Sequence, residues 1–277
     1  MALGDLVHGV WRRFRRKLRV RRAFYDMVGR TTMKRADWQF MNFGLAYADG
    51  QPAPRLTPAE ESERFALQMY HRVAGEALLE GRQVLEIGCG RGGGARYLLR
   101  AFGPERLTAV DFAPALVRFC QSGPSDPRLE FRVGNAMDLD LPDEGFDAVV
   151  NVESSHCYPD QQAFIREVYR VLRPGGTFHY ADDFARRSWN RRRRELRQLG
   201  FEILEEEDIT AGVLESMRAD AERRRQMVKE LAPPLFREVA GHWSGLPGSE
   251  PYERLESGIN RYVRCIARRP GAEGSTN

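Results

Sequence analysis

The sequence predicts an α/β protein with one doubly wound, mostly parallel sheet of seven strands and helices on both faces. Short apolar runs alternate with helical patterns along residues 83–209. Parallel neighbours in a sheet need long crossover connections, which are usually helical and right-handed. The first of these runs is mainly apolar apart from Glu86, which is typical of a parallel strand buried on both faces. A chain of 277 residues with 42% hydrophobic content can bury a core of this size.

The expected elements alternate between strand and helix along the chain. Strands are expected at residues 83–88, 107–111, 129–133, 148–152, 177–181, 201–209 and 262–268. Helices are expected at residues 94–102, 114–120 and 161–172, and a further helix ends at Gly200. A helical segment at residues 211–258 precedes the last strand, and it is about twice as long as an ordinary α/β connection.

The chain divides into five expected regions. They are a helical N-terminal arm at 1–80, a core at 81–210, a helical lid at 211–258, the last core strand at 259–270 and a disordered tail at 271–277. Within the arm, Thr57 as N-cap followed by Pro58 and Glu60 predicts the start of a helix that covers residues 62–79. The residues of this helix that we expect to face inward are Phe65, Met69, Val73 and Leu78.

The most informative stretch is the glycine-rich turn in residues 84–94, Val-Leu-Glu-Ile-Gly-Cys-Gly-Arg-Gly-Gly-Gly. It follows a short apolar strand and leads into a helix. Gly88 and Gly90 allow positive φ and carry no Cβ, so a ligand can lie against the backbone. The free N–H groups at the start of the helix favour an anionic or carboxylate-bearing ligand.

Further motifs follow the turn in a fixed order. Asp111 ends the second strand roughly 20 residues beyond the glycines, where an acidic side chain can bind ribose hydroxyls. The other motifs are Gly134-Asn135-Ala136, Phe146-Asp147 through Asn151, and Arg173-Pro174-Gly175-Gly176. Over residues 84–183 this series resembles the class I S-adenosylmethionine (SAM)-dependent methyltransferases, which have a Rossmann-like fold.

The resemblance implies that SAM is the cofactor and assigns candidate residues to it. Glu86 and the turn would hold the methionyl end, Asp111 the ribose hydroxyls, and Phe112 would lie beside the adenine. Asn135 and Ala136 stand where the family usually has Asp and a small residue at the adenine edge. Asp111 as a helix cap and Asn135 as a plain turn residue are the alternatives. The full set of candidate cofactor-binding residues is Glu86, Gly88, Gly90, Asp111, Phe112, Asn135, Ala136 and Asn151.

Candidate catalytic residues follow the fourth and fifth strands. His156 comes shortly after one strand, and Asp182 and Asp183 end the next, so all three lie at the same sheet edge. A carboxylate behind an imidazole fixes its tautomer and raises its basicity. We favour His156 as the general base and Asp182 as its partner, an arrangement that resembles natural-product and sugar O-methyltransferases. A His that only caps the loop is the alternative, and no ligand spacing supports a metal site.

Over nearly the full length the chain resembles the phthiotriol and phenolphthiotriol dimycocerosate methyltransferases. The segments that carry this resemblance are residues 38–47, 70–72, 91–94, 151–159 and 180–182. It implies methyl transfer to a hydroxyl group of a hydrophobic acceptor such as a polyketide, a lipid or a glycosylated natural product. The expected lid, residues 211–258, differs in detail from the pattern of this family. Carbon or carboxyl methylation, a SAM-binding cyclase and a nucleic-acid methyltransferase remain alternatives, although the segment after the fourth strand lacks the Asn-Pro-Pro-Tyr type of motif.

Two clusters of basic residues are relevant to the possible binding partners of the protein. Residues 12–22 hold eight cations, and Trp11, Phe14 and Leu18 form an apolar stripe along them. A helix docked by this stripe is the leading interpretation, with contact to an anionic membrane surface as a second hypothesis. Arginines between residues 186 and 194 form the other cluster. We expect no nucleic-acid partner, and a homodimer is a further hypothesis.

Composition and cysteine spacing indicate in which cellular compartment the protein is expected. Four widely spaced cysteines predict neither a disulfide framework nor a CxxC metal site, so we expect a reducing cytoplasm. No apolar run reaches the roughly 18–20 residues of a membrane span. If the arm folds over the cofactor mouth, Tyr47 and residues 70–72 become candidates to contact the ligand.

Overall fold

The structure is a computed structural model that describes most of the chain. The described residues are 18–33, 35, 38–48, 50–51, 53–75, 79–232, 237, 240–241 and 244–271. Some of the residues discussed above therefore lie outside the described part: Trp11, Phe14, Leu78 and the tail 272–277.

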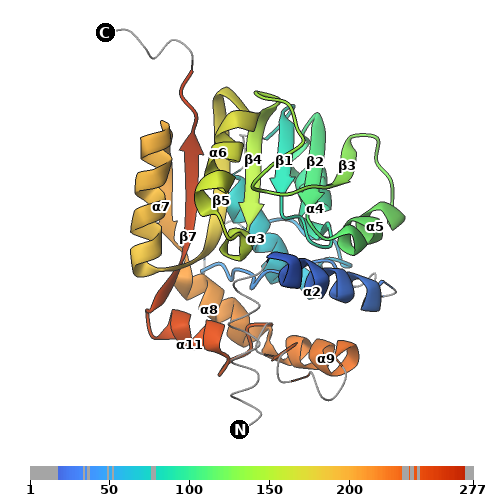
Figure 1. Cartoon of the computed structure of the whole chain (residues 1–277). Helices are drawn as coiled ribbons and strands as arrows, with labels where there is room; N and C mark the ends of the chain where they lie inside the picture. The colour runs from blue at the N-terminus through green and yellow to red at the C-terminus, as the bar shows by residue number, and fades with distance from the viewer. Residues whose placement is uncertain are drawn as a thin grey trace.

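A seven-stranded sheet forms the middle layer of the molecule, with strand order β3-β2-β1-β4-β5-β7-β6 (Figure 1). The strands are β1 (Gln83–Ile87), β2 (Arg106–Asp111), β3 (Leu129–Val133), β4 (Phe146–Val152), β5 (Leu172–Ala185), β6 (Glu202–Asp208) and β7 (Asn260–Arg268). The first five pair in parallel, whereas β7 runs antiparallel to both β5 and β6. The predicted fold class, a mostly parallel α/β sheet of seven strands, is confirmed.

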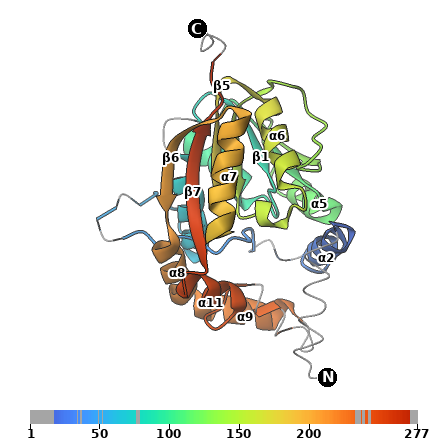
Figure 2. The same ribbon diagram turned by 60° about the vertical axis from the view of Figure 1, so that its left-hand side comes forward.

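Helices cover both faces of the sheet, as the predicted right-handed crossovers require (Figures 1 and 2). On one face lie α3 (Arg64–Ala74), α4 (Gly93–Phe102) and α5 (Pro114–Ser122), and on the other lie α6 (Gln161–Val171) and α7 (Arg186–Leu199). Because successive side chains of a strand point to opposite faces, each buried strand serves both layers. In β1, Val84 packs in the apolar cluster with α3 and α4, and Leu85 packs in the cluster with α6 and α7.

The helix expected over residues 62–79 is shorter than predicted. A 3-10 turn at Glu61–Glu63 precedes α3, which ends at Ala74 because Gly75 takes a positive φ of 67°. The capping contacts that motivated the prediction are present: the backbone N–H and the hydroxyl of Thr57 both donate to Glu60 Oε2, at 2.8 and 3.0 Å. They organise the turn that leads into the helix.

The arginine cluster on α7 is partly neutralised by the protein's own acids. Arg192 is only 4% exposed, and its Nη1 lies 2.8 Å from Glu195 Oε2. Arg193 faces Glu206 on β6 at 3.6 Å. A part of this basic run therefore fastens α7 to its surroundings, which reduces the charge left for an external partner.

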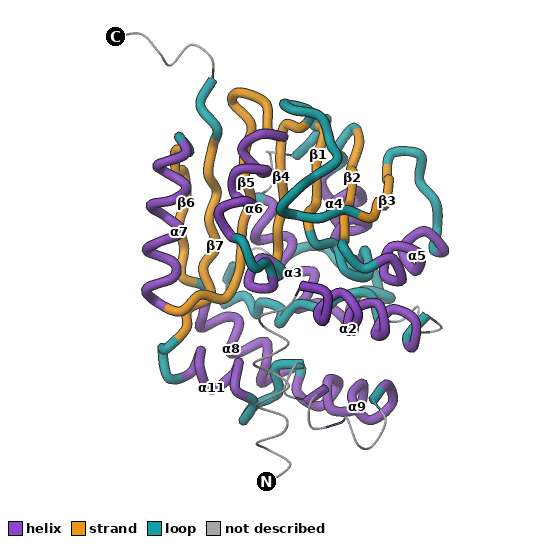
Figure 3. The backbone as a smooth tube through the Cα atoms, viewed as in Figure 1, coloured by secondary structure: helices purple, strands orange, loops and turns teal. Residues whose placement is uncertain are grey.

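The N-terminal arm and the lid both lie at the carboxyl edge of the sheet (Figures 1 and 3). From the arm, α2 (Leu18–Thr31) packs against α5, where Asp26 Oδ1 accepts a hydrogen bond from the backbone N–H of Ala115 at 2.8 Å. The lid contributes α8 (Thr210–Ala219), α9 (Ala221–Leu231) and α11 (Glu250–Glu256). In the described part of the chain, no helix has the length and apolar character needed to cross a membrane.

Arg91, in the glycine-rich turn, ties the arm to the sheet. Its guanidinium is 1% exposed and donates to the carbonyls of Trp38 and Arg35 at 2.5 and 2.8 Å and to the hydroxyl of Thr32 at 2.6 Å. It also lies 3.7 Å from the centre of the Phe119 ring. A charged hydrogen-bond hub of this kind is stable only while every partner is in place.

Replacing Arg91 by Met is expected to destabilise the protein by about 3 kcal/mol or more, because each buried carbonyl left without a donor costs about 1–3 kcal/mol. Urea unfolding measures the change. Arg100→Met is the control, since Arg100 forms a half-exposed pair with Glu60, a type of contact that contributes about 1 kcal/mol or less. Equal losses in the two variants would contradict the role of Arg91.

Candidate active site

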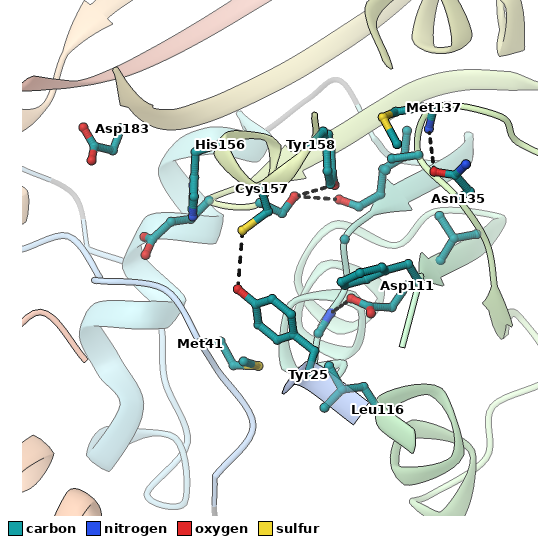
Figure 4. Close-up of a pocket in the computed structure, with 18 of the residues that line it drawn as sticks. Tyr25, Met41, Asp111, Leu116, Asn135, Met137, His156, Cys157, Tyr158 and Asp183 are labelled. Carbon is teal, nitrogen blue, oxygen red and sulfur yellow. Dashed lines mark hydrogen bonds between the residues drawn. The ribbon is translucent and has the colours of Figure 1, made fainter. Parts of the chain in front are cut away.

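A cavity of about 360 Å³ opens at the carboxyl ends of the parallel strands. The glycine-rich turn and the ends of β2 and β4 form its floor, and α2 and residues 41–43 form its cover. Figure 4 shows Asp111 and Asn135 toward one end and His156 and Asp183 toward the other, with Tyr25 of α2 between them. The expected covering of this edge by the arm is therefore present in the structure.

Gly88 has no room for a side chain, and Gly90 has little. Gly88 has φ +79°, and a Cβ there would lie 2.3 Å from the hydroxyl of Ser154. Gly90 has φ +54°, and a Cβ there would lie 3.3 Å from the sulfur of Met41. Both glycines line the cavity. A ligand in the cavity therefore meets bare backbone at this turn.

Asp111 is held in position by the backbone. Its Oδ2 accepts from Gly90 N–H and its Oδ1 from Ala113 N–H, both at 2.9 Å. Burial raises the pKa of the Asp111 carboxyl to about 6, even though the backbone donors favour the ionised form. The N-cap of α5 is Ala113 rather than Asp111, so Asp111 links the turn to the strand end and faces the cavity.

The residues expected near an adenine ring line the same end of the cavity. The Phe112 ring lies 5.7 Å from the ring of Tyr25. Ala136 is buried, and the exposed Asn135 accepts from the backbone N–H of Met137 at 3.2 Å. Asn135 thus serves as a turn residue and also lines the cavity, so both interpretations of this position remain open.

Glu86 and Asn151 lie behind the turn, and neither is among the described residues that line the cavity. Glu86 is 1% exposed, and its Oε1 accepts from the hydroxyl of Tyr70 at 2.7 Å. Burial raises the pKa of Glu86 to about 7. Asn151 Nδ2 donates to the carbonyl of Ile87 at 2.8 Å. Within the described structure, the remaining side-chain oxygens of these two residues, Glu86 Oε2 and Asn151 Oδ1, are buried without a hydrogen-bond partner.

His156 and Asp182 meet at the opposite end of the cavity. His156 lies on the short 3-10 turn Ser155–Cys157, and its Nδ1 is 2.7 Å from Asp182 Oδ1. The Asp182 side chain is fully buried, whereas that of His156 is 45% exposed. The hydroxyl of Ser155 and the backbone N–H of His156 donate to the other carboxylate oxygen at 2.5 and 2.9 Å. These donors fix Asp182 and, through it, the plane of the ring.

The surroundings of His156 and Asp182 favour the ionised form of each side chain. Burial alone would lower the pKa of His156, but the side chain of Cys157 and the carboxylate of Asp182 raise that pKa well above its ordinary value. Burial opposes ionisation of Asp182 as well, and His156 and the Ser155 hydroxyl nevertheless lower the pKa of that carboxyl. With Nδ1 engaged by Asp182, Nε2 is the ring nitrogen left for a ligand.

Sequence reasoning missed several residues at this end of the cavity. Glu153 lines it with a φ of +49°, a strained conformation for a residue other than glycine. Its Oε2 accepts from Phe43 N–H at 2.7 Å and from the Tyr262 hydroxyl at 2.8 Å. Burial raises the pKa of Glu153 to about 8 despite these donors. Glu153 stands in the segment that predicted His156, but its neighbours come from distant parts of the chain.

Asp183 has a different partner from Asp182. Its carboxylate accepts from Asn260 Nδ2 at 2.7 and 2.9 Å, and burial raises its pKa to about 6. Arg254 of the lid, which also lines the cavity, donates to Asn260 Oδ1 at 2.9 Å. No local sequence signal connects these residues, because the chain between positions 183 and 254 separates them.

The other ligand-contact candidates of the arm lie away from the cavity. Tyr70 contacts Glu86, as described. Tyr47 donates to the carbonyl of Gln68 at 3.3 Å, His71 contacts the Tyr97 hydroxyl at 2.9 Å, and Arg72 pairs with Glu207 at 2.8 Å. These residues fasten α3 to its surroundings and are not among the cavity's described lining. The described lining of this cavity therefore gives no support to the prediction that they contact the ligand.

A family model described as a methyltransferase domain matches residues 85–180. The match begins in β1 and ends in β5, and it includes the glycine-rich turn, Asp111 and His156. Together with the strand order, it defines the class: a class I methyltransferase domain.

Two curated relatives cover most of the chain. The probable phthiotriol/phenolphthiotriol dimycocerosates methyltransferase 2 of Mycobacterium ulcerans is 40% identical over 213 residues, which is 76% of this chain and 82% of the relative. The fatty-acid O-methyltransferase of Mycolicibacterium smegmatis is 37% identical over 230 residues, 83% of each chain. The chain therefore belongs to the class I SAM-dependent methyltransferases, in the family that includes the phthiotriol/phenolphthiotriol dimycocerosates methyltransferases, and SAM is its cofactor.

Solved structures share the fold. The [4+2]-cyclase SpnF has a TM-score of 0.69 at 23% identity and covers 90% of this chain and 95% of its own. The geranyl diphosphate C-methyltransferase of Streptomyces coelicolor, in complex with S-adenosyl-L-homocysteine, has a TM-score of 0.62 at 18% identity, with coverage of 88% and 97%.

The cavity fits this cofactor chemically. The side-chain-free turn leaves space for a ligand, the Asp111 carboxylate suits vicinal hydroxyls, and an apolar slot with Phe112 suits a purine. The unpartnered Glu86 Oε2 behind the turn is an acceptor that suits an ammonium group.

Asp111→Asn is expected to weaken SAM binding by roughly 10- to 100-fold, because hydrogen bonds to a charged acceptor contribute about 1.5–3 kcal/mol. Isothermal titration with SAM measures the change. Asp140→Asn, at an exposed acidic residue, is the control and should bind as the wild type does. Unchanged affinity in Asp111→Asn would rule out the ribose contact.

Proposed function

We propose that this methyltransferase transfers the methyl group of SAM to a hydroxyl group of a hydrophobic acceptor, with His156 as the general base. The observation that carries the proposal is the 2.7 Å contact between His156 Nδ1 and the buried carboxylate of Asp182, at the wall of the cavity. The names of the relatives support a lipid-like acceptor, since they include a phthiotriol methyltransferase and a fatty-acid O-methyltransferase. Polyketides and glycosylated natural products belong to the same candidate class.

The cofactor would lie along the floor of the cavity. Asp111 would accept from the ribose hydroxyls, Phe112, Asn135 and Ala136 would surround the adenine, and Gly88 and Gly90 would lie against the methionyl part. Glu86 and Asn151 would support this end from behind the turn. SAM supplies an electrophilic methyl group on a sulfonium, so the protein has only to align the acceptor and remove its proton.

His156 and Asp182 would handle that proton. The Nδ1–H of the neutral ring would donate to Asp182, which would leave the Nε2 lone pair to take the proton of the acceptor hydroxyl. The imidazolium that results is stabilised by the adjacent carboxylate. The proton later leaves to solvent through the exposed side of the ring.

The acidic character of the acceptor end favours a neutral hydroxyl. Glu153 and Asp183 line this part of the cavity together with His156. With a pKa of about 6, Asp183 is largely ionised near neutral pH, and its negative charge disfavours the carboxylate of an acidic acceptor. Arg254 supports carboxyl methylation as the second candidate, because it lines the cavity as a cation and one relative is named a fatty-acid O-methyltransferase. Parallel assays with a long-chain alcohol and a fatty acid of equal length discriminate between the two.

The remaining expectations concern metals and partners. No group of three or more His, Cys, Asp or Glu residues in the described part of the chain is placed to hold a metal ion, and we propose that the reaction proceeds without one. Contact of the basic N-terminal segment with an anionic membrane surface stays a prediction, as does a homodimer. Vesicle sedimentation and light scattering test these two.

His156→Ala is expected to lower the turnover number by roughly 10² or more, because general-base catalysis contributes about 10²–10⁴-fold. The affinity for SAM should change little. Turnover is measured as S-adenosylhomocysteine formed with a lipid hydroxyl acceptor, in buffer with and without EDTA, and the two buffers should give equal rates. Near-normal turnover in the variant would reject His156 as the base.

The pH profile of kcat/KM should report the raised pKa of His156. Below that pKa the ring is protonated and cannot act as a base, so the rate falls about tenfold per pH unit as the pH drops. In the wild type the midpoint of this limb should lie above the ordinary histidine pKa of about 6.5. Asp182→Asn removes the charge that favours the imidazolium, so its limb should move to lower pH with a lower plateau. If the acidic limb of the Asp182→Asn profile stays at the wild-type pH, the electrostatic coupling between His156 and Asp182 is contradicted.

A further inference from the structure

A second cavity lies next to the first, between the arm and the lid. Its volume is also about 360 Å³, and α2, residues 38–43 and α9 enclose it. Neither the expected cofactor residues nor His156 and Asp182 are part of its described lining. Its wall is mainly apolar, with side chains contributed by the two facing helices: Phe24, Met27, Val28, Met227, Val228 and Leu231.

Met41 and Phe43 line both cavities and so form the partition between them. The backbone of Phe43 is held from both sides. Its N–H donates to Glu153 at 2.7 Å, and its carbonyl accepts from Ser216 of α8 at 2.8 Å and from Arg224 of α9 at 2.9 Å. Met41 is an unbranched, adaptable side chain. In the partition, Phe43 is therefore held in place, whereas the side chain of Met41 can rearrange around a ligand.

The two arginines at this cavity are held by partners within the protein. Arg223 and Arg224 line it, but both donate to the carboxylate of Asp220, at distances of 2.6–3.0 Å. Arg224 also donates to the carbonyl of Ser244 at 2.9 Å. Apart from the polar side chains of Thr31, Thr32, Asn42 and Ser244, the surface left for a ligand is apolar. It therefore favours hydrocarbon over polar groups that would lose their water.

An apolar space of this size favours an apolar occupant. Side chains around a void lose the van der Waals contacts that a filled core provides, and cavities lined by aliphatic and aromatic groups stay dry and bind apolar molecules. Because the cavity adjoins the one that contains His156, an occupant here can belong to the same molecule that presents a hydroxyl there.

We propose that the cavity between α2 and α9 binds the hydrocarbon chain of the acceptor, and that the acceptor passes Met41 and Phe43 to place its hydroxyl beside His156. This inference rests on the proposed function and specifies its acceptor: a molecule with a flexible, unbranched apolar chain of many methylenes attached near the reacting group. The chain-binding site is made by the arm and the lid, not by the sheet.

The test measures the affinity of primary alcohols with 4 to 12 carbons by titration calorimetry, in the presence of S-adenosylhomocysteine. In the wild type the dissociation constant should fall by up to about fourfold per added methylene until the cavity is full, as transfer of a CH₂ from water predicts. Val228→Trp fills the cavity and should abolish this dependence for the longer alcohols. Glu222→Trp, which adds the same ring at an exposed position of α9, should leave it unchanged.

A second readout covers the case in which Val228→Trp folds poorly. A dodecanol with a diazirine at the end of its chain is photoactivated on the wild-type protein, and the labelled peptides are identified by mass spectrometry. Label in α2 or α9 is expected. Label elsewhere, no label at a saturating concentration, or an unchanged chain-length dependence in a folded Val228→Trp variant overturns the inference.

The two proposals fail in different ways. If the label lies in α2 or α9 but the wild type never forms S-adenosylhomocysteine from any hydroxyl acceptor, the proposed function is wrong and the chain-binding site stands. If methyl transfer to long-chain alcohols occurs and the label lies elsewhere, the chain-binding site is wrong and the proposed function stands.

Discussion

The rest of the structure depends on the hydrogen bonds by which the core holds residues 38–43 in place. Arg91, from the glycine-rich turn, donates to the carbonyls of Trp38 and Arg35, and Glu153, beside His156, accepts from the backbone of Phe43. These buried hydrogen bonds, charge-assisted in the case of Arg91, place one segment over the strand ends. That segment then separates the cavity at the strand ends from the apolar cavity and contributes a wall to each.

This arrangement would couple the three parts of the proposed function through neighbouring residues. The turn that carries Arg91 also supplies Gly90, whose N–H orients Asp111. The strand end that carries Glu153 also leads into the turn with His156, whose ring is positioned by Asp182. In the proposed function, cofactor binding, proton removal and acceptor binding would share one edge of the sheet, so a shift of the arm by a fraction of an ångström would affect all three.

The fold and the candidate catalytic pair could be predicted from local sequence patterns. The glycine-rich turn, Asp111, His156 and Asp182 lie within residues 84–183, the stretch of the parallel strands, where strand-end position and spacing carry the information. The roles of Glu153 and Asn260 could not be predicted in the same way, because their partners come from segments about 80 to more than 100 residues away. The helix predicted to reach residue 79 ended early because tertiary context placed Gly75 in a positive φ.

A crystal structure of the protein with S-adenosylhomocysteine and a long-chain alcohol tests the central claim most directly. The account predicts the alcohol oxygen within about 3.2 Å of His156 Nε2, in reach of proton transfer, with its hydrocarbon chain running past Met41 into the space between α2 and α9. An oxygen remote from the imidazole, or a chain that leaves the site without entering that space, would contradict it.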